Sequence, residues 1–178
     1  MVKLNQKGQE FSVFKLLISA IIAIVVLTLL LQILNIIDFN PNTDPSKAAE
    51  NLLNDMDSST YTEKVSKKLD FKKENSISAA ALANNVGLDN EQICLGLASD
   101  LESTGDFVLN QTHSLITYNG DSSVRVKLAG ICAPESQLDE TFIEENTAVL
   151  RNTGFSVSDC SFPAGLKACV LVLIRSNE

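Results

Sequence analysis

Hydrophobic positions along this chain are concentrated in one long N-terminal run. Residues 16–37 read LLISAIIAIVVLTLLLQILNII, and only uncharged polar side chains interrupt them (Ser19, Thr28, Gln32 and Asn35). A helix of this length reaches roughly 33 Å at about 1.5 Å per residue, which is enough to cross a hydrocarbon core of about 30 Å. The pattern therefore predicts a membrane-spanning helix.

Two other interpretations of this run fit less well. A secretory signal peptide has a shorter apolar core, of about 7 to 15 residues, followed by a small-x-small cleavage site. This run is followed instead by Asp38-Phe39-Asn40-Pro41. A buried helix of a soluble domain usually keeps one polar face. We therefore expect a segment embedded in a membrane or in a bundle of helices.

The charges on either side of the run predict its orientation. Lys3, Lys7 and Lys15 precede it with Glu10 as the single acid, and Asp38 is the first charge after it. Lys and Arg favour the cytoplasmic flank of a membrane helix. We therefore expect a single-pass membrane protein with a cytoplasmic N-terminus and an extracellular C-terminal domain.

Shorter patterns follow the run. Asp44-Pro45 offers an N-cap and a first-turn proline for a helix that continues to about Met56. Residues 65–71 suit an edge strand bordered by lysines, residues 77–87 a short helix that ends at Gly87, and residues 93–97 a strand.

The clearest strand pattern comes next. Residues 114–118 and 123–128 are joined through Asn119-Gly120, the residue pair that best tolerates the positive φ angles of a type I′ turn, and so predict a hairpin. In its second strand the alternation predicts three apolar residues on one face and two basic residues on the other (Val124, Val126 and Leu128; Arg125 and Lys127).

The C-terminal patterns complete the predicted fold. A helix opens at Pro134 and stops at Gly154, and residues 169–174 are apolar on both faces, which predicts a buried central strand. The sum predicts an α+β fold, with a long hydrophobic N-terminal helix followed by an extracytoplasmic head that has an antiparallel β-sheet and short helices.

All four cysteines lie beyond the apolar run (Cys94, Cys132, Cys160 and Cys169). An even number of cysteines in an oxidising compartment usually forms disulfides. Because Cys160 and Cys169 flank a Pro/Gly loop, we pair them with each other and pair Cys94 with Cys132. Four cysteines allow three connectivities, and four buried thiols are the alternative. The absence of a Cys-x-x-Cys pair argues against a metal site.

The domain after the run is acidic. Removing the three lysines and the single acid of the N-terminal region from the chain's 14 basic and 22 acidic residues leaves 11 against 21, a net charge of about −10. Nucleic acids are normally bound through basic patches, so we expect no nucleic-acid partner. The lysines of residues 64–73 are interpreted as a solvated edge.

Ala83, Gly87 and Ile93 have the spacing of a helix-turn-helix motif. We interpret them instead as a plain connection from a helix to a strand. The second helix of such a motif would begin with the acidic residues near Asp89, which repel phosphate.

Candidate catalytic residues are sparse. His113, the single histidine, has no nucleophile motif or phosphate-binding glycine loop beside it. The acids of residues 139–145 lie on an ordinary helix surface. We therefore expect no enzymatic activity, no cofactor and no metal. Asn110-Gln111-Thr112 matches the acceptor sequence for N-glycosylation at Asn110.

The tract before the apolar run points to a family. Lys7-Gly8-Gln9, followed by a hydrophobic helix and a cysteine-bearing head, resembles archaeal type IV pilin-like proteins with a class III signal peptide. The resemblance covers residues 1–37 well and the head only in architecture. It implies that a prepilin-peptidase-like enzyme recognises Lys7 and cuts between Gly8 and Gln9, so that the mature chain starts at Gln9.

The chain departs from the family at one position. Many pilins carry Glu at the fifth mature residue, where this chain has Val13. Its charges near the start of the helix are Glu10 and Lys15. These side chains either pair between neighbouring helices or anchor the helix at an interface.

Together these observations predict the domain organisation and the function. Residues 1–8 form a cytoplasmic leader, 9–37 the transmembrane or filament-core helix, 38–64 a helical stalk and 65–178 the disulfide-bearing head. The hypothesis is a major or minor pilin of an archaeal type IV pilus-like surface filament, which binds copies of itself, contacts the membrane and serves adhesion. The alternative is a membrane-anchored extracytoplasmic binding or envelope-associated domain that does not polymerise.

Overall fold

The computed structural model describes residues 15–27 and 44–176 and divides into two units, residues 1–41 and 42–178. In the first unit, residues 15–27 form a helix. None of the helices within the described residues is long and apolar enough to cross a membrane. This finding corrects two predictions, the long membrane-spanning helix of the fold class and the single-pass membrane localisation.

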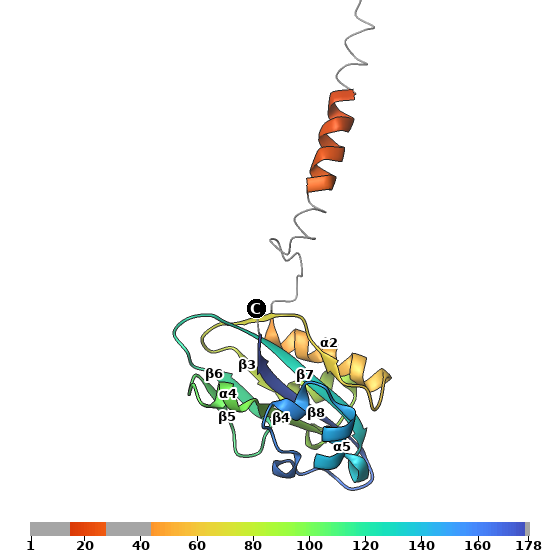
Figure 1. The fold of residues 1–178 in the computed structure, drawn as a ribbon, viewed down its shortest axis with the longest axis vertical. Coiled ribbons are helices and arrows are strands. Elements are labelled where there is room, and N and C mark those ends of the chain that lie inside the picture. The colour runs from red at the N-terminus through yellow and green to blue at the C-terminus, as the bar shows by residue number, and fades with distance from the viewer. Residues whose placement is uncertain (1–14, 28–43, 177–178) are drawn as a thin grey trace, which may run out of the picture. The chain divides into compact units, whose positions relative to one another are not determined.

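The second unit has an α+β fold with two sheets (Figure 1). Its elements, in chain order, are α2 (Pro45–Ser58), β1 (Lys64–Val65), β2 (Leu69–Phe71), β3 (Ser76–Ser78), α3 (Ala79–Val86), the 3-10 helix η1 (Asn90–Gln92), β4 (Ile93–Leu97), α4 (Ser99–Glu102), β5 (Phe107–Leu109), β6 (Leu115–Tyr118), β7 (Val124–Pro134), η2 (Glu135–Gln137), α5 (Glu140–Asn146), η3 (Leu150–Asn152), η4 (Val157–Asp159) and β8 (Lys167–Arg175).

The larger sheet is mixed. Its order is β1-β7-β8-β4, with β2 also paired to β7, while the smaller sheet has the order β3-β6-β5. The β4–β8 pair is parallel, from Ile93 opposite Cys169 to Leu97 opposite Leu173, and the other pairs are antiparallel. The larger sheet is therefore mixed, and the prediction of an antiparallel sheet is wrong for it. The long connection from β4 through the smaller sheet and β7 allows β8 to return in the same direction as β4.

The predicted central strand is confirmed in β8, which lies between β7 and β4 and is fully buried from Ala168 to Leu173. Its residues alternate between two separate hydrophobic cores, as expected of a pleated strand. Leu171 and Leu173 belong to the first core, which includes the apolar side of α2. Val170 and Val172 belong to the second core, which includes residues of α5, η3 and η4. The larger sheet is thus covered on both faces.

Helix α2 forms as its sequence predicts and packs closely on the sheet. The Asp44 carboxylate accepts a hydrogen bond from the Ser46 backbone N–H at 3.0 Å, and Pro45 begins the helix. Met56 lies on the buried side of α2, over Gly130 of β7. A side chain at Gly130 would come within 2.7 Å of the Met56 sulfur, so the glycine permits this close approach.

The predicted hairpin through Asn119-Gly120 is wrong. β6 pairs with β3 and β5 in the smaller sheet, whereas β7 pairs with β1, β2 and β8 in the larger one. Gly120 does not have a positive φ angle. Its role is steric, because the Tyr118 ring folds over it and the Tyr118 hydroxyl donates to the Ser122 carbonyl oxygen. Pairing with distant strands overrides the local turn preference.

The predicted helix from Pro134 to Gly154 is broken into η2, α5 and η3. Asp139 starts α5 by accepting from the Phe142 N–H at 2.8 Å, and the Thr147 hydroxyl ends it by donating to the Ile143 carbonyl oxygen at 2.7 Å. The Glu63 carboxylate then accepts hydrogen bonds from the backbone N–H groups of residues 148–150, at 2.7 to 3.1 Å. This side chain orders the chain just after α5.

Two predicted elements are shorter than expected. The edge strand over 65–71 is split into β1 and β2, which both pair with β7. The helix over 77–87 begins only at Ala79, because residues 76–78 form β3. Its predicted end is confirmed, since Gly87 adopts the left-handed conformation at φ +73°.

All four cysteines form disulfides, as predicted, but the predicted connectivity is wrong. Cys94 pairs with Cys160 and Cys132 pairs with Cys169, with Cα–Cα distances of 5.9 and 4.1 Å. Cys132 and Cys169 stand opposite each other on β7 and β8 and belong to the first core, whereas Cys94 belongs to the second core, against which Cys160 packs. A Cys160–Cys169 bond would have to cross the sheet.

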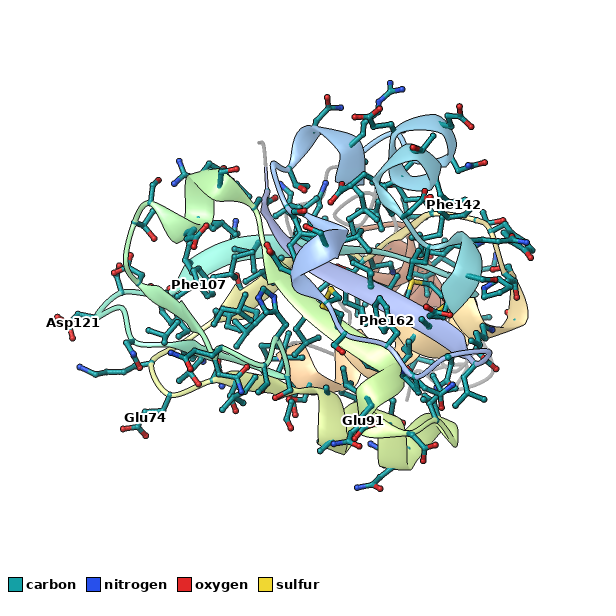
Figure 2. The ribbon with its side chains drawn as sticks, turned by 90° about the horizontal axis from the view of Figure 1, so that it is seen from below. Glu74, Glu91, Phe107, Asp121, Phe142 and Phe162 are labelled. Carbon is teal, nitrogen blue, oxygen red and sulfur yellow. A yellow bond between two sulfur atoms is a disulfide. The ribbon has the colours of Figure 1, made fainter. Side chains whose placement is uncertain are left out.

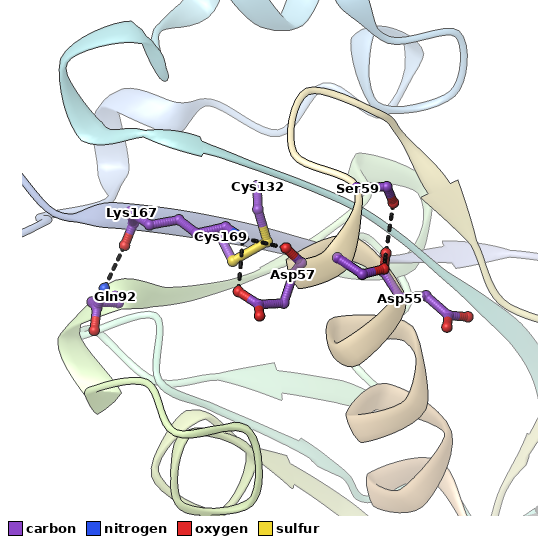
Figure 3. The surroundings of a disulfide bond; sticks show 8 residues. Asp55, Asp57, Ser59, Gln92, Cys132, Lys167 and Cys169 are labelled. Atoms are coloured by element: carbon purple, nitrogen blue, oxygen red, sulfur yellow. Dashed lines mark hydrogen bonds and ion pairs between the residues drawn. A yellow bond between two sulfur atoms is a disulfide. The ribbon is translucent and has the colours of Figure 1, made fainter.

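Figure 3 shows the Cys132–Cys169 bond beside an ion pair that links β8 to the end of α2. The Lys167 ammonium donates to the Asp57 carboxylate and to the Asp57 carbonyl oxygen, both at 2.7 Å. The Gln92 side chain donates to the Lys167 carbonyl oxygen at 2.6 Å. The start of β8 is therefore fixed to α2, to β7 and to η1 at once.

Unreduced tryptic mapping tests the connectivity, because cleavage at lysine and arginine places each cysteine in its own peptide. We expect residues 74–125 linked to 152–167, and residues 128–151 linked to 168–175. A link between 152–167 and 168–175, or four free thiols, would contradict the structure.

Glu63→Ala should destabilise the domain, because three backbone N–H groups lose a charged acceptor. We expect a loss of about 1–3 kcal/mol in the free energy of unfolding, measured by urea denaturation. Glu91→Ala is the matched control, since this exposed side chain makes no hydrogen bond or ion pair with other described residues. Equal stability of the two variants would contradict the role of Glu63.

Candidate functional site

The helix over residues 15–27 is the most unusual surface that the structure describes. Large apolar side chains are exposed around all its sides, with exposed fractions from 40% at Ile18 to 69% at Leu16. Similar exposure occurs at seven further positions (Leu17, Ile21, Ile22, Ile24, Val25, Val26 and Leu27). Surface helices of globular domains instead keep a polar face opposite their apolar stripe.

Polar groups on this helix are few. From residue 16 to residue 27 the sequence contains no charged side chain. The Ser19 hydroxyl donates to the Lys15 carbonyl oxygen at 2.9 Å, so this polar group is satisfied within the helix. Ser19 also lines a shallow groove with four apolar residues (Ile22, Ala23, Val26 and Leu27). The helix therefore offers apolar contacts and close packing, with little hydrogen-bonding capacity toward a partner.

The residues predicted for leader recognition and cleavage, Lys7, Gly8 and Gln9, lie outside the described residues. Glu10, one of the two predicted interface charges, also lies outside them. The other, Lys15, begins the described helix. The roles predicted for these residues therefore stay predictions.

Asn110, the predicted glycosylation site, lies in the loop between β5 and β6. Its Nδ2 atom, to which a glycan would attach, donates to the hydroxyls of Thr112 and Ser114 at 2.8 and 2.9 Å. Its Oδ1 atom accepts from the backbone N–H groups of Ser114 and Leu115. The side chain thus shapes the loop, and a glycan would take the place of one of the two Nδ2 hydrogens that donate these bonds.

His113 has a structural role in this loop. Its carbonyl oxygen accepts from the Leu95 N–H at 2.7 Å, and its Nδ1 atom lies 3.2 Å from the Leu95 carbonyl oxygen. His113 thereby covers part of the free edge of β4, which would otherwise be open to pairing with another strand. It has a positive φ angle of 51°, which the loop requires for this contact.

A polar pocket lies at the start of α2, but its Asp and Asn side chains are already hydrogen-bonded within the domain. Asp44, Asp70, Lys72 and Asn75 line it together with Pro45. Asp44 caps α2, Asp70 pairs with Arg125 and Asn75 accepts from the Lys72 N–H at 2.7 Å. Within the described ranges, no group of three His, Cys, Asp or Glu residues could hold a metal ion. This pocket therefore has no convergent set of free ligands.

The chain was also compared with known proteins. No protein-family model, no curated protein and no solved structure matches it. The residues of this chain are therefore the basis for any proposal about its function.

Proposed function

We propose that the chain is a structural subunit of a pilin-like filament, in which the apolar segment that includes residues 15–27 packs against the same segment of other copies. The observation that carries this proposal is the exposure of apolar side chains on every side of that helix. In its N-terminal tract, Lys7-Gly8-Gln9 supports a prepilin-peptidase-like enzyme as the processing partner.

The energy available from this packing is large. Complete burial of a Leu, Ile or Val side chain contributes about 1.5–3 kcal/mol. The nine large apolar side chains of the helix are roughly half exposed, so their burial would contribute on the order of 10 kcal/mol. This contribution exceeds the lower estimates of the entropic cost of association.

The distribution of these side chains favours many copies over two. A helix with one apolar stripe can bury that stripe against a single partner. A helix that is apolar all round needs neighbours on every side to bury its surface. Identical helices that pack by a repeated non-closing contact form an open helical assembly. The domain of residues 44–176 has its own two cores and disulfides, so it remains folded outside such a bundle.

A single charge inside the bundle tests this packing. Ile22→Glu should abolish ordered assembly at concentrations where the unchanged chain assembles, because an unpaired buried carboxylate costs several kcal/mol. Sedimentation and negative-stain microscopy, scored for filaments of uniform width, provide the measurement. Gln111→Glu, which adds the same charge at an exposed position of the head, is the control and should assemble normally.

Filaments of normal appearance from Ile22→Glu would contradict the proposal. A monomeric unchanged chain would do so as well, and would favour a binding domain that does not polymerise.

Processing gives a second test. Mass spectrometry of protein isolated from its native cells should find a mature N-terminus at Gln9 in the assembled fraction. An assembled fraction that still begins at Met1 would contradict cleavage after Gly8.

A further inference from the structure

One face of the larger sheet is only partly covered by the second core. Along β7, Ala133, Ile131 and Ala129 are buried beneath residues of α5, η3 and η4. The next two residues on this face are Lys127 and Arg125, which do not belong to that core. The cover therefore ends near Ala129, and the start of β7 has an uncovered face.

Basic residues occupy this uncovered end. Val126 and Leu128 belong to the first core, so Arg125 and Lys127 lie on the opposite face of β7. On β2, Leu69 and Phe71 belong to the first core as well. Lys68, next to Leu69, therefore shares the face of Lys127. Asp70 is on the same face, and its carboxylate accepts from Arg125 Nε at 3.1 Å.

A bulge increases the local charge. Between the paired positions of β1 and those of β2, the edge strand has one residue more than β7. The Ser66 backbone N–H donates to the Leu128 carbonyl oxygen at 2.7 Å, and the Leu128 N–H donates to the Ser66 hydroxyl oxygen at 2.8 Å. Lys67 and Lys68 are therefore left opposite Lys127. Like charges that stand opposite each other destabilise a sheet. An acidic partner would relieve the repulsion between these lysines.

Among the described residues, these lysines form no ion pair of their own, and Asp70, the acid on their face, is paired with Arg125. The ion pairs among the described residues involve Lys73, Arg125, Lys167 and Arg175, and none involves Lys67, Lys68 or Lys127. Two apolar residues lie among the basic ones: the exposed Val65, opposite Ala129, and the partly buried Ile174, which lies opposite Lys127 and packs against the edge of the second core. We call this surface the basic strip (Val65, Lys68, Arg125, Lys127 and Ile174).

The complementary surface lies at the opposite end of the same sheet face. Figure 2 shows α5, marked by Phe142, on the side of the domain away from Glu74 and Asp121, which neighbour β2 and β7 respectively. Glu144 and Glu145 of α5 are exposed and make no ion pair with another described residue. They contribute to the strongly acidic character of the domain.

We propose that the basic strip of one copy binds α5 of the next copy, with Lys68 and Lys127 facing Glu144 and Glu145. The sheet face has its acidic helical cover at one end and the uncovered basic strip at the other. A neighbour placed head to tail would extend the helical layer over the strip. This contact joins two different surfaces, so it repeats without closing. It rests on the proposed filament and defines the contact between its heads.

Cross-linking with a mixture of labels detects this contact directly. Full-length chain labelled with ¹⁵N is assembled with unlabelled chain, and a carbodiimide then joins carboxylates to neighbouring amines. We expect amide links from Lys68 or Lys127 of one isotope to Glu144 or Glu145 of the other. Assemblies that form without any such mixed link would overturn the proposal.

Charge reversal provides the second measurement. Lys68→Glu with Lys127→Glu should raise the concentration needed for assembly at least about tenfold, because like charges would then face each other. Glu144→Lys with Glu145→Lys should do the same, and the fourfold variant should restore assembly. Lys47→Glu with Asn84→Glu and Gln111→Glu is the control, since it changes the net charge equally at three exposed positions away from the strip.

The outcomes separate this contact from the filament itself. If the Lys68 and Lys127 variant assembles like the control, or the fourfold variant is not restored, the head contact is wrong while assembly through the apolar helix stands. If the unchanged chain sediments only as a monomer, both proposals are wrong.

Discussion

The pairing of β7 with β8 is the constraint on which the described domain depends. Nearly all of β8 is buried, and a strand buried on both faces needs a neighbour on each edge and a cover on each side. The domain meets this need with β7 and β4 at the edges, α2 over one face, and α5 with η3 and η4 over the other. Each cover is too short to be a stable helix on its own, so the sheet determines where it forms.

The covers are held by polar contacts and disulfides at their ends. Lys167 ties the start of β8 to the last turn of α2, and Glu63 binds the backbone that follows α5. The Cys132–Cys169 bond joins the two central strands, and the Cys94–Cys160 bond joins β4 to the segment after η4. The two disulfides connect residues that are 66 and 37 positions apart in sequence, so they constrain the unfolded chain as well as the folded one.

Local sequence predicts the elements whose cause is local. Asp44-Pro45 marks the start of α2, Gly87 the end of α3 and the apolar run the buried strand β8, since each of these signals is carried by neighbouring residues, even where the sheet supplies the stability. The hairpin prediction through Asn119-Gly120 fails because both strands find distant partners. The disulfide prediction fails because the side of the sheet to which each cysteine points depends on register.

The same limit applies to the candidate sites. Residues 64–73 were recognisable from sequence as a lysine cluster, but Lys127 joins that cluster only through the β2–β7 register and the bulge beside it. Alternation along residues 123–128 did indicate that Lys127 faces away from the core, and the structure agrees. The missing information was which strand lies beside it. That partner follows from burial of the whole sheet, not from any local pattern.

The two proposed contacts would contribute different properties to an assembly. Packing of apolar helices gains most of its free energy from the apolar area that is buried. This area changes little when a helix rotates about its axis or slides along it. Opposite charges on rigid strands and helices contribute less affinity but fix register, because a shifted neighbour places like charges together. A filament subunit needs both properties: strong cohesion and one defined position for each neighbour. On this argument, weakening the head contact should leave copies associated but irregularly stacked, whereas weakening the apolar contact should separate them.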